Sequence, residues 1–278
     1  MDYFTGTVLI MAFFMIIIHC VETLAYAVRI SGARVRLIAS ALSLFNIMVL
    51  VSRTSNMIVQ PVSGNFTDGA HTAETLAHAE NQFRIVIGAT TIGTLIGALL
   101  LPTFIAIFSR AIIYLAHEGG SVPALVKRGL SFTYMRRVRN HLAFPSRSYI
   151  KGIQYKDIPK RLFLTNMLIT AVYTVGVLAA LYASLRVPEY GTTAVMSSGM
   201  INGIATILMV VFVDPKVSVL ADNVVNKRGS YLDLRTTTVM MVGSRLCGTL
   251  LAQLLFIPGS LYIAYFSQGL AAFLELFK

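Results

Sequence analysis

Long apolar runs recur along the chain and are separated by shorter polar segments. A helix needs roughly 20 apolar residues to cross the hydrocarbon core of a bilayer, and six runs reach this length. In chain order they are Thr7–Val28, Leu37–Ile58, Ile85–Phe108, Leu162–Leu185, Tyr190–Val213 and a run from about Thr236 to Phe266. No convincing strand pattern is present, and open sheets are excluded from lipid. The sequence therefore predicts an all-α, polytopic transmembrane bundle of about six spans that forms one integral membrane domain over residues 1–278.

The last apolar run is longer than one span needs. It contains Arg245 and, in its second half, Pro258 followed by Gly259. A proline in a helix removes a backbone donor and produces a kink. This run is expected to be a tilted helix, a helix kinked at Pro258, or a span that ends in an interfacial segment.

Composition supports a membrane protein. Only 13% of the 278 residues are charged and the mean hydropathy is +0.72, whereas soluble domains carry about 25% charged residues. The two cysteines, Cys20 and Cys247, lie inside apolar runs and offer neither a disulfide framework nor a metal-binding pair. We expect no metal and no cofactor. The N-terminus has no basic segment before its long apolar run, so we expect an uncleaved first span.

Basic residues gather in alternate loops. The segments Arg29–Arg36, Arg110–Arg161 and Asp214–Arg235 hold three, eleven and four Lys or Arg residues, while Val59–Phe83 holds none. The positive-inside rule places the three basic segments in the cytoplasm and both termini outside. The net charge of +11 then reflects this bias and anionic headgroups. Basic patches interleaved with aromatic residues are not apparent, so we expect no nucleic-acid partner.

Several polar side chains interrupt the spans. A charge at membrane depth costs about 2.5–3.5 kcal/mol on insertion scales, so it normally faces a cavity or a partner. The candidates are His19 and Glu22 in the first span, Asn46, Arg53 and Asn56 in the second, Arg245 in the sixth, and Arg29 at the inner mouth. Counting residues from the predicted inner ends places Glu22 and Arg245 at one depth and Arg53 farther out.

Each candidate has a structural and a functional interpretation. Glu22 and Arg245 are either an ion pair that holds two helices together or part of a working site. Arg53 either reaches the outer interface or lines a path, Arg29 is either an ordinary loop arginine or a ligand contact, and His19 and Asn46 either bridge helices or serve a site. We expect the small-residue pairs Gly93/Gly97 and Gly199/Gly203 to be packing notches.

The functional interpretation is a path for an anionic lipid. The guanidinium group of arginine is a permanently charged, planar fork that suits phosphate and pyrophosphate oxygens. Arginines at two depths fit a headgroup that passes through the protein while its tail stays in the bilayer. Membrane lipids are therefore the expected partners.

Two motifs resemble a known family. The stretch Thr23–Gly32 (TLAYAVRISG) and the stretch Ser43–Met57 (SLFNIMVLVSRTSNM) are similar to the signature of the Amj family of lipid II flippases, which are alternates to MurJ. The Asp214-Pro215-Lys216 segment and Ser244-Arg245 are also similar to that family. The resemblance covers essentially the whole chain and implies transport of lipid II from the inner to the outer leaflet of the bacterial cytoplasmic membrane.

This resemblance implies a role for each buried group. The pyrophosphate of lipid II would pair with Arg53 and Arg245, with Arg29 at the inner mouth, and Asn46 and Asn56 would donate to it or to sugar hydroxyls. Glu22 would hold an arginine in place or accept a proton, and His19 is the other candidate proton carrier. Since six helices enclose little space for a disaccharide-pentapeptide, we also expect a homodimer.

Two other functions fit some of the residues. A membrane phosphatase acting on undecaprenyl pyrophosphate would use buried arginine, serine and carboxylate, and Ser52-Arg53-Thr54-Ser55 offers part of that set. Such an enzyme would also need an acidic cluster and a glycine-rich phosphate turn, which are not seen beside Ser52. A scaffold or regulator of envelope synthesis is the remaining alternative. A catalytic residue is not predicted.

Overall fold

The computed structural model describes residues 3–64, 73–121, 123, 125, 127 and 159–277, and within them the chain is helical without strands. Six of its helical segments are long and apolar enough to cross a membrane. They are α1 (Gly6–Val35), α2 (Ile38–Gly64), α3 (Ala73–His117), α7 (Lys160–Arg186), the composite segment Pro188–Val225 and α11 (Tyr231–Glu275). The predicted six-span helical bundle is confirmed. The orientation of the termini remains a prediction, and most of the basic loop 110–161 lies outside the described residues.

The fifth span is composite rather than one regular helix. It consists of η2 (Pro188–Tyr190), α8 (Gly191–Met196), α9 (Ser198–Leu208), the π-helical turn η3 (Met209–Val213) and α10 (Asp214–Val225). Pro215 has no N–H, so the Val211 carbonyl loses its usual helical partner. The backbone widens here instead, and the Asp214 N–H donates to the carbonyl of Met209.

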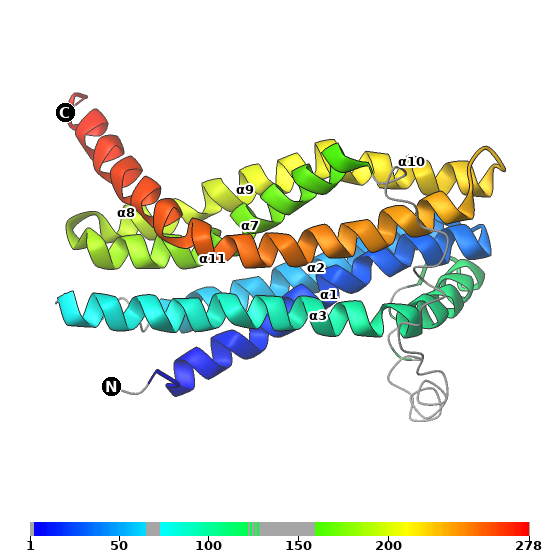
Figure 1. Cartoon of the computed structure of the whole chain (residues 1–278), viewed down its shortest axis with the longest axis horizontal. Helices are drawn as coiled ribbons and strands as arrows, with labels where there is room; N and C mark the ends of the chain where they lie inside the picture. The colour runs from blue at the N-terminus through cyan, green and yellow to red at the C-terminus, as the bar shows by residue number, and fades with distance from the viewer. Residues whose placement is uncertain are drawn as a thin grey trace.

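The long last apolar run of the sequence forms a single helix, α11. It is continuous from Tyr231 to Glu275 and contains Pro258 within it. Its C-terminal part, drawn in red, bends away from the bundle (Figure 1). The bend follows from the proline, which removes one helical hydrogen bond. The run is thus one kinked helix rather than a broken one.

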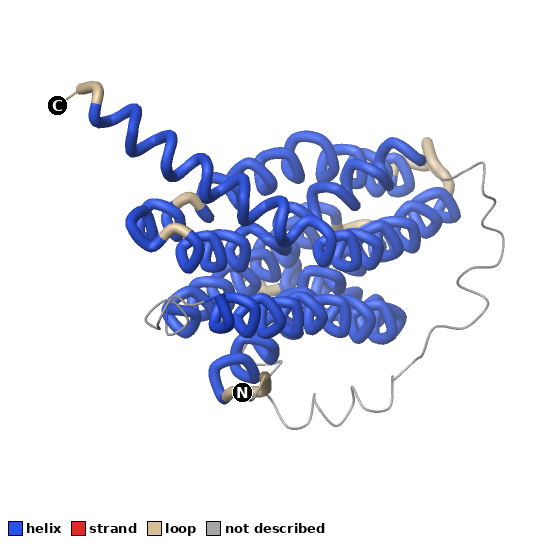
Figure 2. Tube along the Cα trace, turned by 60° about the vertical axis from the view of Figure 1, so that its left-hand side comes forward, coloured by secondary structure: helices blue, strands red, loops and turns tan. Residues whose placement is uncertain are grey.

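The helices form two groups that face each other. Helices α1, α2 and α3 make one group, and α7, α9 and α11 make the other, as the views of Figures 1 and 2 show. Within the first group α3 lies directly on α1, where a β-carbon on Gly97 would be 2.7 Å from Cβ of Thr23 and 2.9 Å from the Cys20 carbonyl oxygen. In the second group a β-carbon on Gly248 of α11 would be 2.7 Å from the Met167 carbonyl oxygen of α7.

Only one of the two predicted glycine notches packs within the chain. Gly93 and Gly97 touch α1, whereas no described residue lies within 4 Å of a β-carbon built on Gly199 or Gly203. The expectation that Gly199/Gly203 forms a notch is therefore wrong for the single chain. The same spacing serves close packing only where another helix covers it.

This difference makes a matched pair of substitutions. Gly97→Ala should destabilise the protein by about 1–3 kcal/mol, because the added methyl group displaces the α1 backbone. Gly203→Ala adds the same methyl group in open space within the single chain, so the stability of the monomeric protein should be unchanged or slightly higher. Unfolding of both variants in detergent micelles measures the difference. Equal stabilities would contradict the close approach of α1 and α3.

Candidate polar cavity between the two helix groups

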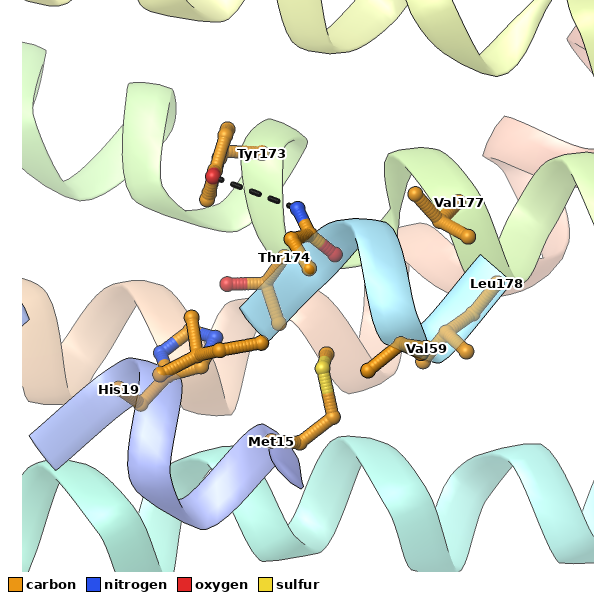
Figure 3. Close-up of a pocket in the computed structure, with 9 residues that line it drawn as sticks. Met15, His19, Val59, Tyr173, Thr174, Val177 and Leu178 are labelled. Atoms are coloured by element: carbon orange, nitrogen blue, oxygen red, sulfur yellow. Dashed lines mark hydrogen bonds between the residues drawn. The ribbon is translucent and has the colours of Figure 1, made fainter. Parts of the chain in front are cut away.

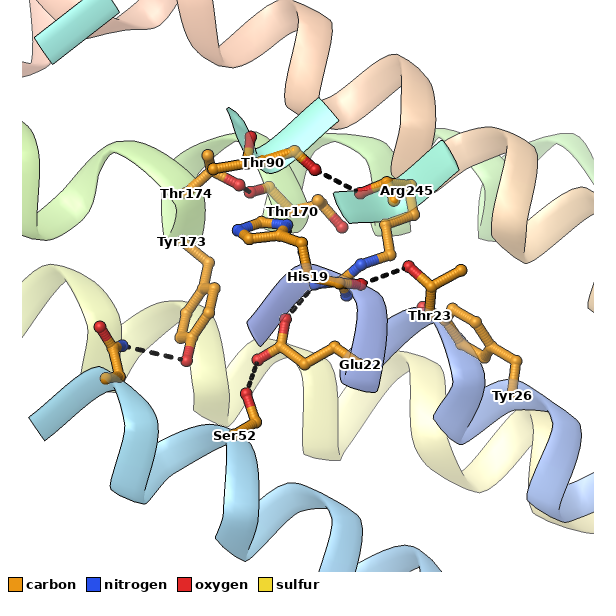
Figure 4. A network of polar contacts seen from close by, with 12 residues as sticks. His19, Glu22, Thr23, Tyr26, Ser52, Thr90, Thr170, Tyr173, Thr174 and Arg245 are labelled. Carbon is orange, nitrogen blue, oxygen red and sulfur yellow. Dashed lines mark hydrogen bonds and ion pairs between the residues drawn. The ribbon is translucent and has the colours of Figure 1, made fainter. Parts of the chain in front are cut away.

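A buried ion pair joins the two helix groups at the middle of the bundle. Glu22 of α1 pairs with Arg245 of α11, and the Arg245 side chain is 5% exposed. The Ser52 hydroxyl of α2 donates to Glu22 at 2.7 Å, so three helices meet at one carboxylate (Figure 4). The predicted common depth of Glu22 and Arg245 is confirmed by this contact. A pair so enclosed needs several hydrogen bonds to offset its desolvation.

Neighbouring polar groups complete the surroundings of Arg245. Its Nη2 lies 3.5 Å from Nδ1 of His19, which is 1% exposed. On the other side the Tyr26 hydroxyl donates to Asn166 at 3.2 Å, and the Asn166 amide donates to Ser244 at 2.6 Å. The polar face of α1 is thus matched by polar groups on α7 and α11. Its members recur every three or four residues, as one helix face requires.

A cavity of about 480 Å³ opens beside this ion pair. Its walls come from α1 and α2 on one side and from α7, α9, η3, α10 and α11 on the other. Glu22 and Arg245 lie at one end, and the exposed side chains of Asn46 and Arg53 on α2 also line it. The volume falls in the range of small-molecule sites. The two helix groups therefore enclose a space, here called the polar cavity, whose mainly apolar lining also carries charged side chains.

Asn56 lies outside that cavity but is connected to it. The Asn56 amide donates to the Tyr173 hydroxyl at 3.4 Å, and Tyr173 lines the cavity. Asn56 and His19 instead border a separate space of only about 10 Å³ (Figure 3). This space is near the minimum for a single water molecule. Asn56 and His19 thus do not line the cavity but contact two residues that do, Tyr173 and Arg245.

Arg29 forms a second ion pair, with Asp214 of the cavity wall. Its Nη2 is 2.7 Å from Oδ1 of Asp214 and its Nη1 donates to the Asp214 carbonyl at 3.1 Å. The guanidinium also stacks on the Phe45 ring, 4.5 Å from the ring centre. Arg29 is 4% exposed and belongs to α1, so it is not an ordinary loop arginine. It ties α1 and α2 to the start of α10.

Four charged side chains line the cavity, Glu22, Asp214, Arg53 and Arg245, and Arg53 pairs with neither carboxylate. Asp214 is paired with Arg29, and Glu22 is paired with Arg245. Arg53 has neither an ion pair nor a hydrogen bond from its side chain to any other described residue. The cavity thus has one guanidinium that lacks a counter-ion within the described part of the chain. An anion is the natural complement of such a site.

The structure brings together most of the groups predicted from the sequence. Glu22, Arg53, Asn46 and Arg245 line one cavity, whereas His19, Asn56 and Arg29 lie just behind its walls. Three residues that line the cavity were not predicted from the sequence: Tyr26, Tyr173 and Asp214. Asn166, whose side-chain oxygen accepts from Tyr26, was not predicted either. Asn166 was the accessible signal, because it is the one amide side chain in the uncharged run Leu162–Leu185.

Comparison with known proteins places the chain in a family. The model of the family described as Amj, Alternate to MurJ, matches residues 14–267. A protein of Bacillus subtilis (strain 168) named Lipid II flippase Amj is 56% identical over 268 residues, which are 96% of this chain and 99% of that protein. No solved structure matches the chain. With the family model and this relative both covering nearly its whole length, the chain belongs to the Amj family.

Proposed function

We propose that this chain is a lipid II flippase of the bacterial cytoplasmic membrane. Such a protein moves the undecaprenyl-pyrophosphate-linked precursor of peptidoglycan from the inner to the outer leaflet and is a transporter rather than an enzyme. The name of the 56% identical relative supports this function, as do the six helices able to span a membrane.

The observation that carries the proposal is the uncompensated charge of Arg53 in the polar cavity. A pyrophosphate supplies the missing counter-charge and accepts a bidentate guanidinium contact. Asn46 lies on the same wall and can donate to the pyrophosphate or to a sugar hydroxyl. Arg245 is available once Glu22 gives up its contact, so the carboxylate holds the arginine in place while the site is empty. Asn56 and Arg29 would join only after their present partners release them.

The cavity also has an apolar side suited to a lipid tail. Leu50 of α2 and Val210 of η3 line it and are 64% and 53% exposed. These two residues belong to the least buried spans, α2 and the composite fifth span. Because the tail and these exposed side chains are both apolar, a polyprenyl tail can remain against these helices in the hydrocarbon while the headgroup occupies the cavity. Movement of the weakly packed spans would expose the headgroup to either side in turn.

A test of the function uses purified protein in liposomes that contain fluorescent lipid II. A membrane-impermeant reductant quenches only the outer leaflet, so a flippase raises the quenched fraction above the half expected for protein-free liposomes. We expect this rise. Quenching that stays at one half with folded protein would contradict the proposal.

A phosphatase acting on undecaprenyl pyrophosphate is not supported. The 56% identical relative is named a flippase. In the structure the Ser52 hydroxyl donates to Glu22, and that carboxylate also pairs with Arg245. Both carboxylate oxygens of Glu22 are therefore engaged, one by Ser52 and the other by Arg245.

We further propose that the protein works as a homodimer. The cavity of about 480 Å³ is small for a disaccharide-pentapeptide, and a second copy would enlarge the enclosed space. Gly199 and Gly203 offer an uncovered small-residue face on α9. Gly203→Cys, in a chain whose Cys20 and Cys247 are replaced by serine, should form a disulfide-linked dimer in native membranes. Oxidation that yields only monomers for Gly199→Cys and Gly203→Cys would contradict a dimer through α9.

A further inference from the structure

A second cleft lies at one end of the bundle. It has a volume of about 750 Å³ and is formed by the first turns of α7 and α10. Three cationic side chains line it, Lys160 and Arg161 on α7 and Lys216 on α10, and none of its lining residues in the described part of the chain is acidic. We call it the basic cleft. Its end of the bundle is the one that the positive-inside rule places in the cytoplasm.

The chemistry of the basic cleft fits a phosphorylated lipid headgroup. Lys160, Arg161 and Lys216 come from two different helices, so they converge on one space rather than following one solvated face. Pro159 precedes α7 and provides no side-chain cap, which leaves the positive end of the helix directed at the same space. Leu162, Val219 and Leu220 form an apolar wall beside the cations. A site with cations and an adjoining apolar wall matches an anionic head attached to a hydrocarbon tail.

The basic cleft adjoins the polar cavity along both of its helices. Asp214 lines the cavity and the next residue, Pro215, lines the cleft. On α7, Leu162 lines the cleft, and Ile169, seven residues later on the same helix face, lines the cavity. The Arg29–Asp214 ion pair lies at this junction. The basic cleft and the polar cavity therefore lie one after the other along α7 and α10.

We propose that the basic cleft is the loading site, where the pyrophosphate of an undecaprenyl-linked lipid in the inner leaflet binds before it enters the polar cavity. This inference rests on the proposed flippase function. The three cations bind the pyrophosphate, and the tail lies along Val219 and Leu220. Because loading precedes the passage itself, the cleft determines the lipid II density needed for half-maximal transport. Arg53 instead determines the maximal rate at which a loaded headgroup crosses.

The test separates these two effects. The variant Lys160→Gln/Arg161→Gln/Lys216→Gln removes the cations of the cleft. Its matched control, Arg34→Gln/Lys227→Gln/Arg228→Gln, removes the same charge from exposed residues at the same end of the bundle that do not line the cleft. Transport of fluorescent lipid II by each protein in liposomes is measured as a function of lipid II density.

The cleft variant should need about tenfold more lipid II for half-maximal transport, as expected when charge-assisted contacts are lost. Its maximal rate should stay within about twofold of the unchanged protein, and the control should match the unchanged protein in both respects. If the cleft variant and the control reach half-maximal transport at the same lipid II density, the proposal that the cleft is the loading site is overturned.

A crosslinking measurement tests binding to the basic cleft independently of transport. A benzophenone amino acid at Val219 in nanodiscs should crosslink radiolabelled undecaprenyl pyrophosphate, and the cleft variant should lose the crosslink. Excess unlabelled undecaprenyl pyrophosphate should displace the label, whereas excess phosphatidylglycerol should not. Equal displacement by phosphatidylglycerol would make the cleft a general phospholipid site and overturn the proposal. If the unchanged protein moves no lipid II, the proposed function fails, and the crosslink still decides whether the cleft binds pyrophosphate.

Discussion

Replacement of Arg53 by alanine is expected to reduce lipid II transport by about 10–100-fold, the range that follows from losing a charge-assisted contact of about 1.5–3 kcal/mol. The Arg53 side chain lines the polar cavity and has no ion pair or hydrogen bond to another described residue. Its loss should therefore leave folding and the amount of protein in the membrane unchanged. Transport in liposomes and immunoblots of membranes measure the two properties.

Two further variants sharpen this prediction. Arg53→Lys keeps the charge but loses the planar fork, so it should retain part of the activity. Arg34→Ala removes an exposed arginine away from the cavity and should transport normally. If Arg53→Ala transports as well as Arg34→Ala, the arginine only reaches the interface and does not contact the headgroup.

Breaking the Glu22–Arg245 pair should have the largest effect on stability. Arg245→Met leaves the Glu22 carboxylate, which is 17% exposed, without its partner. Removal of one member of a buried pair costs about 3–5 kcal/mol. The double variant Glu22→Gln/Arg245→Met removes both charges and should recover much of this loss, because no buried charge is left unpaired. Unfolding of the single and double variants in detergent measures the coupling.

Transport by the double variant decides between the two roles of the pair. If Arg245 contacts the headgroup during passage, the double variant should be stable and still inactive. A stable double variant that transports lipid II at the normal rate would show that the pair only holds α1 and α11 together. The comparison depends on stability and transport being measured on the same preparations.

The spans and the depth of their charges could be predicted from the sequence because both depend on local quantities. Apolar length determines where a helix can cross the membrane, and the rise per residue places Glu22 and Arg245 at one level. Their direct ion pair and their common cavity with Arg53 agree with that estimate.

What the sequence could not provide are partners between distant segments. Arg29 and Asp214 both lie at the ends of apolar runs, where they resemble ordinary loop charges, yet α1 continues to Val35 and buries Arg29 against Asp214. Gly93/Gly97 and Gly199/Gly203 have the same spacing and differ only in what covers them. The π-helical turn before Pro215 likewise depends on backbone geometry that apolar periodicity does not reveal.

The most direct test of the central claim is the amount of lipid II in the outer leaflet of cells in which this protein is the sole lipid II flippase. We expect lipid II to become accessible to an externally added, membrane-impermeant probe, and Arg53→Ala at equal protein level to prevent this. Lipid II that remains in the inner leaflet although the unchanged protein is well expressed would contradict the flippase function and the role of the polar cavity.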